Sequence, residues 1–343
     1  MLTHCARSVR IPAAFCGLVG LKATWGVVPY SGILGLHADI DHCGPMTKTV
    51  WDNACLLEAI AGPDGMDDRQ PALIPEDSLK YSKHLASFLK ESSGSKKPLD
   101  GYRIGVLKEG FEMPQLDRNA EEAVRAAIND LAVLGASVSE VSIPEHSKIC
   151  TAWTCMQALA GGRDGLLGDQ TGRKGLMMTD RAGNYKPTIS QTRFDSLGPG
   201  AKNMYLKYLY IVERYGTLVN AKATNVVRRQ TRAYDAALSS VDALAMPTIP
   251  FPASRIFHDG QDIGPLERLE RVAGTVLNTA PFNATGHPAL SLPVGFVPAP
   301  EKSAVRLPAA LQIVGAQYGD LSCLKIAAAW ERSVDWQARQ FGA

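Results

Sequence analysis

The residues near the start of the chain that could do chemistry lie in one segment, SVRIPAAFCGLVGLKAT, which runs from Ser8 to Thr24. A serine hydroxyl can attack a carbonyl carbon when a base within hydrogen-bonding distance accepts its proton. Ser8 lacks the Gly-x-Ser-x-Gly frame of an α/β-hydrolase, and no His and Asp stand out as triad partners. The residue types alone therefore leave the role of Ser8 open.

Five segments of the chain, taken in order, closely resemble the characteristic blocks of the amidase signature family. Together they span nearly the whole sequence. They are SVRIPAAFCGLVGLKATWGVVPYSG, IDHCGPMTKTVWDNACLLEAIAG, DALAMPTIP, NTAPFNATGHPALSLPVG and LQIVGAQYGDLSCLKIAAAWERSVDW.

This resemblance implies the fold class and the reaction. The fold is an α/β/α sandwich with a large mixed central sheet, which residues 1–343 would form as a single domain. The reaction is hydrolysis of a C–N amide bond through a Ser–cis-Ser–Lys triad, in which a second serine relays the proton to an uncharged lysine. Burial can keep such a lysine uncharged, because it disfavours the ammonium form and so lowers the pKa of the side chain.

Carried over by position, the family motif assigns Ser8 as the nucleophile that forms the acyl-ester intermediate. Arg10 supports the site structurally through its fixed fork of donors. The oxyanion is expected to be stabilised by the backbone N–H groups of Cys5, Ala6, Arg7 and Ser8.

The start of the chain departs from the family pattern. The bridging serine and the catalytic lysine lie well before the nucleophile in the family, and no residue of this sequence matches either of them. We therefore expect the chain to lack the N-terminal portion of the family fold. Ala6 and Arg7 also replace two glycines, and an arginine side chain there would crowd the oxyanion hole.

Three other basic residues are weak candidates for the missing base. Lys22 belongs to the Gly-Leu-Lys turn and is interpreted as a packing and loop-anchoring residue, and Lys48 as structural. His4 lies too close to the terminus for precise geometry. The seven histidines show no metal-ligand spacing, and no glycine-rich loop has a nucleotide-binding frame. We expect no metal and no cofactor.

The elements that position these residues follow from hydrophobic patterns. Tyr102–Leu107 predicts a buried strand, and Asp117 begins a helix with an apolar face that ends near Gly135. The segment ASVSEVSI then alternates like a strand, which makes a βαβ unit and predicts that the two strands are neighbours or one strand apart. VDALAMPTIP predicts a buried strand that stops at Pro247, and Cys323–Arg332 a helix.

Residues 150–240 predict a mostly helical insertion near the substrate pocket. A loop, Gly161–Gly175, interrupts it. Insertions in this region of the family shape specificity, so we expect the loop to border the pocket.

Composition and charge exclude several classes of partner. The formal net charge is only +2 and the basic residues are dispersed, so we expect no nucleic acid and no membrane surface as partners. No apolar run approaches the roughly 20 residues that span a bilayer. Seven cysteines without a CxxC pair indicate a reducing compartment, and we expect a cytoplasmic protein that acts on a small-molecule amide.

Three functions remain open on the sequence alone. The first is an amidase-type hydrolase that acts through Ser8. The second is a truncated or degenerate relative without catalysis, such as a binding or scaffold protein or a chain without function. The third is a chain that resembles the glutamine-hydrolysing component, the A subunit, of a tRNA-dependent amidotransferase.

Loss of the preceding family segment has a predicted structural consequence. Six apolar residues of the N-terminal region would then face water and favour a homo-oligomer formed through that region. They are Phe15, Leu18, Val19, Leu21, Val27 and Val28.

Overall fold

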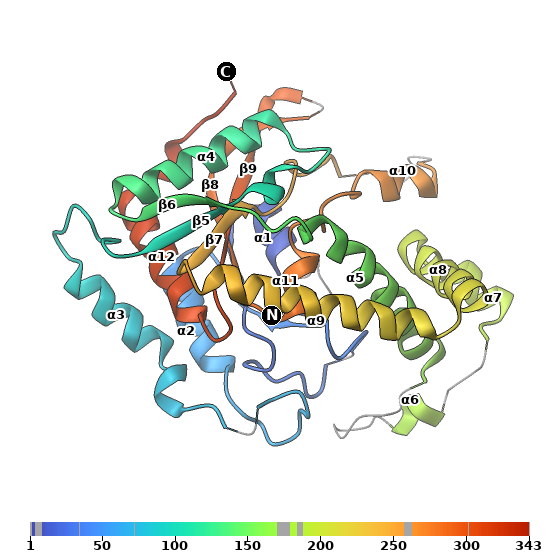
Figure 1. Ribbon diagram of the computed structural model, residues 1–343. Helices are drawn as coiled ribbons and strands as arrows, with labels where there is room; N and C mark the ends of the chain where they lie inside the picture. The colour runs from blue at the N-terminus through green and yellow to red at the C-terminus, as the bar shows by residue number, and fades with distance from the viewer. Residues whose placement is uncertain are drawn as a thin grey trace.

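A mixed sheet lies at the centre of the protein, between two layers of helices, in the computed structural model (Figure 1). The structure describes residues 2–3, 9–33, 35–71, 73–169, 179–183, 188–256, 263–300 and 302–342.

The described strands form one large sheet and one small pair. They are β1 (Leu2–Thr3), β2 (Val19–Lys22), β3 (Cys43–Gly44), β4 (Met46–Thr47), β5 (Arg103–Leu107), β6 (Ser137–Val141), β7 (Ala243–Pro247), β8 (Ala289–Ala299) and β9 (Lys302–Val314).

The described α-helices are α1 (Arg10–Cys16), α2 (Val50–Ile60), α3 (Tyr81–Glu91), α4 (Arg118–Val133), α5 (His146–Ala160), α6 (Thr179–Gly183), α7 (Gln191–Ser196), α8 (Pro199–Tyr215), α9 (Leu218–Leu238), α10 (Pro265–Glu270), α11 (Ala280–Thr285) and α12 (Asp320–Ser333). Short helices of other types are η1 (Glu76–Leu79), η2 (Lys108–Phe111), η3 (Gly161–Leu167) and η4 (Trp336–Ala338).

The large sheet has the strand order β4-β2-β8-β9-β7-β5-β6 in the described part of the chain. Strands β7, β5 and β6 are parallel, and the pairs from β4 to β7 are antiparallel. Strand β1 pairs separately with β3. The expected fold class, α/β with a large mixed central sheet, is therefore confirmed.

The βαβ unit has the predicted form. Strands β5 and β6 pair in parallel, with Ile104 opposite Val138, and α4 connects them. The Asp117 carboxylate accepts a hydrogen bond from the Ala120 N–H at 2.9 Å and caps α4. Gly135 follows the helix with a φ of 106°, which glycine adopts more readily than other residues.

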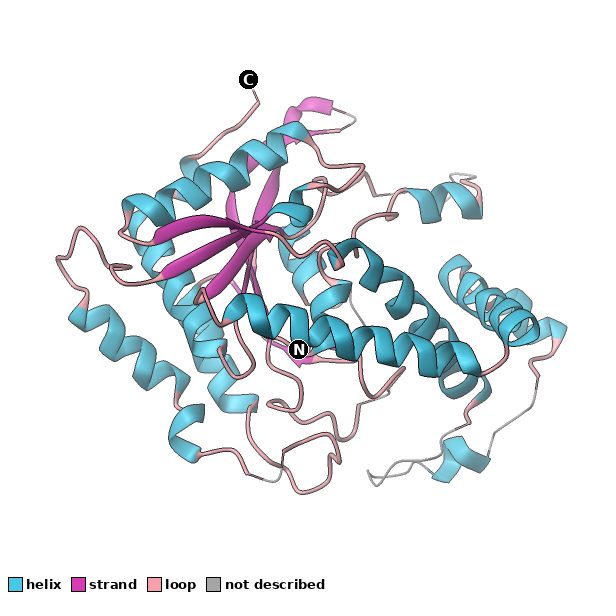
Figure 2. Ribbon diagram, in the orientation of Figure 1, coloured by secondary structure: helices cyan, strands magenta, loops and turns pink. Residues whose placement is uncertain are grey.

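Each face of the sheet has its own apolar core. Residues of α2, α3, α4 and α12 pack together with the strands on one face, and residues of α5, α9 and α11 pack on the other. Figure 2 shows these helices on the two sides of the twisted strands. Among the described residues, no helix is both long and apolar enough to cross a bilayer.

The prediction of a loop at Gly161–Gly175 is wrong for the first half of this segment. Gly161–Leu167 instead continue α5 as the π-helix η3. A Cβ atom on Gly161 would lie 2.1 Å from Met204 Sδ, and one on Gly162 would lie 2.1 Å from Tyr208 Cγ. The two glycines thus let α8 pack closely on η3, and residues 170–175 lie outside the described part.

The expected exposure of the six N-terminal apolar residues is wrong for four of them. Val19, Leu21, Val27 and Val28 are buried in the core on the α2 face of the sheet. Phe15 and Leu18 are half-buried. Strand β2 lies inside the sheet, between β4 and β8, and helices α1 and α2 pack against it, so its side chains are buried. This removes the apolar-exposure argument for association through the N-terminal region.

Candidate active site

The predicted nucleophile and oxyanion-hole residues cannot be placed in the structure. Cys5, Ala6, Arg7 and Ser8 lie outside the described residues, so their roles stay predictions. The chain is described again from the next residue, Val9, and helix α1 begins at Arg10.

Arg10 is fully enclosed and uses its guanidinium to join three parts of the chain. Its two terminal nitrogens donate to Gln312 Oε1 at 2.6 Å and to the Thr279 carbonyl at 2.7 Å. It also donates to Asn283 Oδ1. Burial lowers the pKa of Arg10 to about 9. Because this value is still above neutral pH, the side chain stays charged. Charged donors make the stronger hydrogen bonds, so this contact fixes α1 against α11 and β9.

The segment that contains α11 is held by further buried side chains. Asn283 Nδ2 donates to the Ile40 carbonyl at 2.9 Å, and His42 Nε2 donates to the Asn283 carbonyl at 3.0 Å. Gln312 Nε2 donates to the Asn278 carbonyl at 2.8 Å. We call the set Arg10, His42, Asn278, Asn283 and Gln312 the polar junction.

Lys22 lies fully buried beside this junction. Its ammonium nitrogen donates to the Ala23 carbonyl at 2.7 Å and reaches the Gly286 carbonyl at 3.4 Å. Burial, and then the positive charge of Arg10, lower the pKa of Lys22 well below its usual value, while the Asp320 charge opposes that shift. The contacts anchor β2 to the loop after α11.

Asp320, the first residue of α12, holds the segment that directly follows β2. Its carboxylate accepts from the Thr24 N–H at 2.8 Å and from the Thr24 hydroxyl at 2.6 Å. Burial raises the pKa of Asp320, whereas the bonds from Thr24 lower it.

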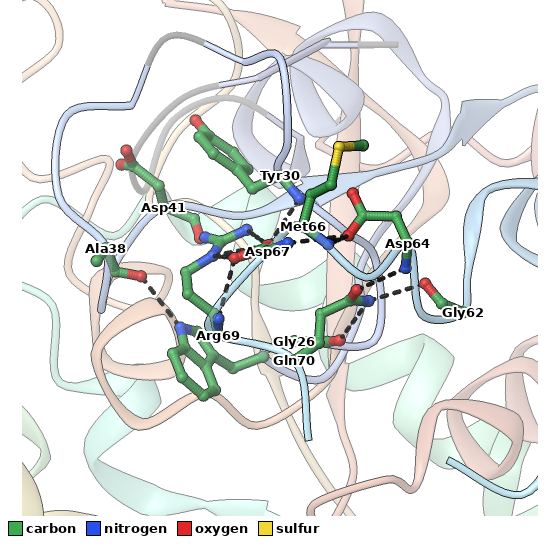
Figure 3. Close-up of polar contacts among 11 residues, drawn as sticks. Gly26, Tyr30, Ala38, Asp41, Gly62, Asp64, Met66, Asp67, Arg69 and Gln70 are labelled. Carbon is green, nitrogen blue, oxygen red and sulfur yellow. Dashed lines mark hydrogen bonds and ion pairs between the residues drawn. The ribbon is translucent and has the colours of Figure 1, made fainter. Parts of the chain in front are cut away.

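A second group of polar residues surrounds Arg69 and contacts the segment that contains Asp41 (Figure 3). Arg69 donates to Asp67 at 2.7 Å and to the Asp41 carbonyl at 3.0 Å, and its guanidinium lies 4.3 Å from the centre of the Tyr30 ring. The Asp41 carboxylate accepts from the His37 N–H at 2.9 Å, and burial raises its pKa. Residues 40–42 are therefore held between Arg69 and Asn283.

Sequence reasoning assigned no role to most of these side chains. Asn278 and Asn283 lie in the quoted block NTAPFNATGHPALSLPVG, which marks the segment but not the partners of its amides. Arg69 lies in a stretch, GPDGMDDRQ, that has the composition of a turn. Gln312 is the one polar residue in the apolar run Leu307–Val314, a local signal that could have indicated a buried partner.

Taken together, the fold and the junction define an α/β protein in which a buried arginine connects the segment after Ser8 to the sheet and to α11. The family model described as Amidase matches residues 3–324. The chain belongs to this family, and the resemblance seen in the sequence is confirmed.

Two relatives with different names illustrate what the chain is similar to. An enantioselective amidase of Rhodococcus rhodochrous is 34% identical over 334 residues, which are 95% of this chain and 59% of the relative. The A subunit of glutamyl-tRNA(Gln) amidotransferase from Methanosarcina barkeri is 32% identical over 334 residues, 97% of this chain and 64% of the relative. The chain thus spans about three fifths of the length of these relatives.

Solved structures share the fold. The A subunit of glutamyl-tRNA(Gln) amidotransferase from Thermotoga maritima has a TM-score of 0.67 at 26% identity, covering 97% of this chain and 62% of that one. A 6-aminohexanoate cyclic dimer hydrolase has a TM-score of 0.71 at 22% identity, over 98% of this chain and 65% of that one.

Proposed function

We propose that this chain carries the nucleophile and the surrounding scaffold of an amidase-type hydrolase, which cleaves the C–N bond of a small or medium amide. The observation that carries the proposal is the buried Arg10 side chain with its three acceptors, two residues after Ser8. It joins α1 to the Asn278–Asn283 segment and to Gln312. The planar fork of guanidinium donors fixes the start of α1, and with it the backbone that follows Ser8, against the sheet.

The reaction proposed is acyl transfer to Ser8. The Ser8 oxygen attacks the amide carbonyl as a base takes its proton, the amine leaves with a proton, and water then hydrolyses the acyl ester. Backbone N–H groups of residues 5–8 would stabilise the oxyanion. The base is not assigned to a residue of this chain, and we interpret Lys22 as an anchor because both of its hydrogen-bond partners are backbone carbonyls.

Two alternatives compete with this proposal. The amidotransferase alternative is supported by 32% identity to the A subunits of several such enzymes. A non-catalytic relative is supported by Ala6 and Arg7, which take the place of two glycines next to the nucleophile.

The test compares two proteins: residues 1–343 as printed, and the same chain extended at its N-terminus with the preceding segment of the Rhodococcus amidase. Both are assayed on a panel of primary and aryl amides, and ammonia or amine release is measured. We expect hydrolysis by the extended protein and little or none by the printed chain.

Variants of the extended protein then test the nucleophile. Ser8→Ala should abolish turnover and should also abolish labelling by a fluorophosphonate, which reacts with activated serines. Ser87→Ala, a change at an exposed serine of α3, should leave both intact. Activity only when the partner subunits of an amidotransferase are added would favour the amidotransferase alternative. A folded extended protein that neither turns over nor reacts with the probe would favour the non-catalytic one.

A further inference from the structure

His146, the first residue of α5, is buried and has a hydrogen-bond partner on each ring nitrogen. Its Nδ1 lies 2.6 Å from the Tyr234 hydroxyl of α9, and its Nε2 lies 3.0 Å from Asn278 Oδ1. The pattern of residues around His146 has no local feature that indicates these partners, because Tyr234 and Asn278 are 88 and 132 residues away in the sequence.

The partners of Asn278 determine which nitrogen of His146 carries the proton. Asn278 Nδ2 donates to the Gly110 carbonyl at 2.9 Å and to the Pro247 carbonyl at 2.7 Å. Its Oδ1 can then only accept, so His146 Nε2 must donate. Nδ1 of the neutral ring accepts from the Tyr234 hydroxyl.

Burial of the ring favours this neutral form. Burial lowers the pKa of His146, while Asn278 and the carboxylate of Glu109 on η2 oppose the shift. Burial raises the pKa of Tyr234 well above its usual value, and raises that of Cys150, one turn along α5, to about 12. Both of these neighbours therefore stay neutral.

The chain of hydrogen bonds continues from Asn278 to Arg10. The Asn278 carbonyl accepts from Gln312 Nε2 at 2.8 Å, and Gln312 Oε1 accepts from Arg10 at 2.6 Å. Every member is buried, with no more than 2% of its surface exposed. In such buried surroundings the hydrogen bonds depend on one another. If one bond is broken, its donor and acceptor cannot bond to bulk water instead.

We propose that His146 is a positioning residue: as the neutral Nε2–H imidazole it couples helices α5 and α9 to Asn278 and, through Gln312, to Arg10, which follows Ser8 by two residues in the sequence. The proposal rests on the proposed amidase function, and it makes the helical region between residues 146 and 238 a determinant of the position of Arg10 and, through it, of the rate of the chemical step. A residue that only packs would act through its ring contacts with Tyr234 and Phe282, which phenylalanine could supply.

The physical coupling is tested by nuclear magnetic resonance on the isotope-labelled 343-residue chain. We expect the side-chain nitrogens of wild-type His146 to report a single neutral Nε2–H form at pH 7. Tyr234→Phe removes one hydroxyl and should shift both the His146 ring signals and the Arg10 guanidinium signals. The matched control is Tyr81→Phe, at a buried tyrosine of α3, which should shift neither. A proton on Nδ1 alone in the wild type, or an Arg10 signal that ignores Tyr234→Phe, would overturn the coupling.

Kinetics of the N-terminally extended protein test the consequence for catalysis. Tyr234→Phe should lower kcat on the order of tenfold and His146→Phe on the order of a hundredfold, with KM changed less than about twofold, since misplacement of reacting groups acts on the chemical step. His146→Gln keeps a donor for Asn278 and should recover part of the loss. Equal losses for His146→Gln and His146→Phe, or an effect on KM alone, would contradict the positioning role. If the extended wild type has no activity, the amidase proposal fails, and the resonance experiment still decides whether His146 is coupled to Arg10.

Discussion

The β5–α4–β6 unit and the polar junction are stabilised by different interactions. Helix α4 presents apolar side chains to the sheet, among them Val124 and Leu131, which are almost fully buried. The junction instead places an arginine, a histidine and three amide side chains in surroundings from which water is excluded.

The difference lies in how each region tolerates change. Apolar burial is non-directional, at about 25 cal/mol per Å², so neighbouring side chains can compensate for one another. A buried hydrogen-bond donor or acceptor contributes only with its partner present, and costs on the order of 1–3 kcal/mol without it. The junction should therefore be the more sensitive region, and the predictions below test this.

The largest effect is expected for Arg10→Met. The change leaves Gln312 Oε1, the Thr279 carbonyl and Asn283 Oδ1 without their donor, and should lower the free energy of unfolding by about 4 kcal/mol. The control Arg125→Met removes an exposed ion pair with Glu121 and should cost less than about 1 kcal/mol. Urea unfolding of both variants measures the difference, and similar losses would erase the contrast between the two regions.

Leu131→Ala tests the apolar region by itself. Leu131 is completely buried in α4, and its truncation should cost about 3 kcal/mol through lost transfer energy and a residual cavity. Val133→Ala, two residues further on and 76% exposed, should change stability by less than about 0.5 kcal/mol. A loss at Leu131 that exceeds the loss at Arg10 would mean that directional contacts do not dominate.

Acidification should destabilise the protein through His287, a buried histidine two residues after α11. Burial lowers the pKa of His287 to about 4, although the Asp235 carboxylate lies 3.0 Å from its ring. The unfolded chain binds this proton near the ordinary value of about 6.5, so the unfolded state is favoured as pH falls from about 6.5 to about 4. Above that window the contribution of His287 no longer changes with pH.

The measurement compares wild type with His287→Gln, which cannot take up the proton. As the pH is lowered from 6.5 to 4, the free energy of unfolding should fall more steeply for wild type than for the variant. The difference in slope should be up to about 1.4 kcal/mol per pH unit. Subtracting the variant removes the opposing contribution of the buried carboxyls Asp41 and Asp320, whose pKa values burial raises. Parallel curves for the two proteins would contradict the neutral state of His287.

The smallest expected effect concerns the start of α4. Asp117→Ala removes the side chain that accepts from the Ala120 N–H and should cost about 1 kcal/mol. Asp117→Asn keeps an acceptor and should stay within a few tenths of a kcal/mol of wild type. If both variants lose the same free energy of unfolding, the effect comes from the negative charge at the helix N-terminus and not from the capping hydrogen bond.

The sequence by itself determined the elements whose signals are local. These signals are the apolar run of β5, the cap and apolar face of α4, and the proline that ends β7. Each of them depends only on residues that are close together in the sequence. The family followed from short motifs of the same kind. Such signals can be interpreted without knowing the rest of the fold, because a helix or strand repeats its pattern along the chain.

Only the tertiary structure decided what the polar side chains bind. Arg10 meets acceptors 269 to 302 residues away, and no periodicity links such positions. The same holds for His146, and for Gly161 and Gly162, whose role depends on α8 packing against them. Hydrogen bonds have strict distance and angle requirements, so the partner of a buried polar group is determined only when the elements that carry both groups have been placed in space.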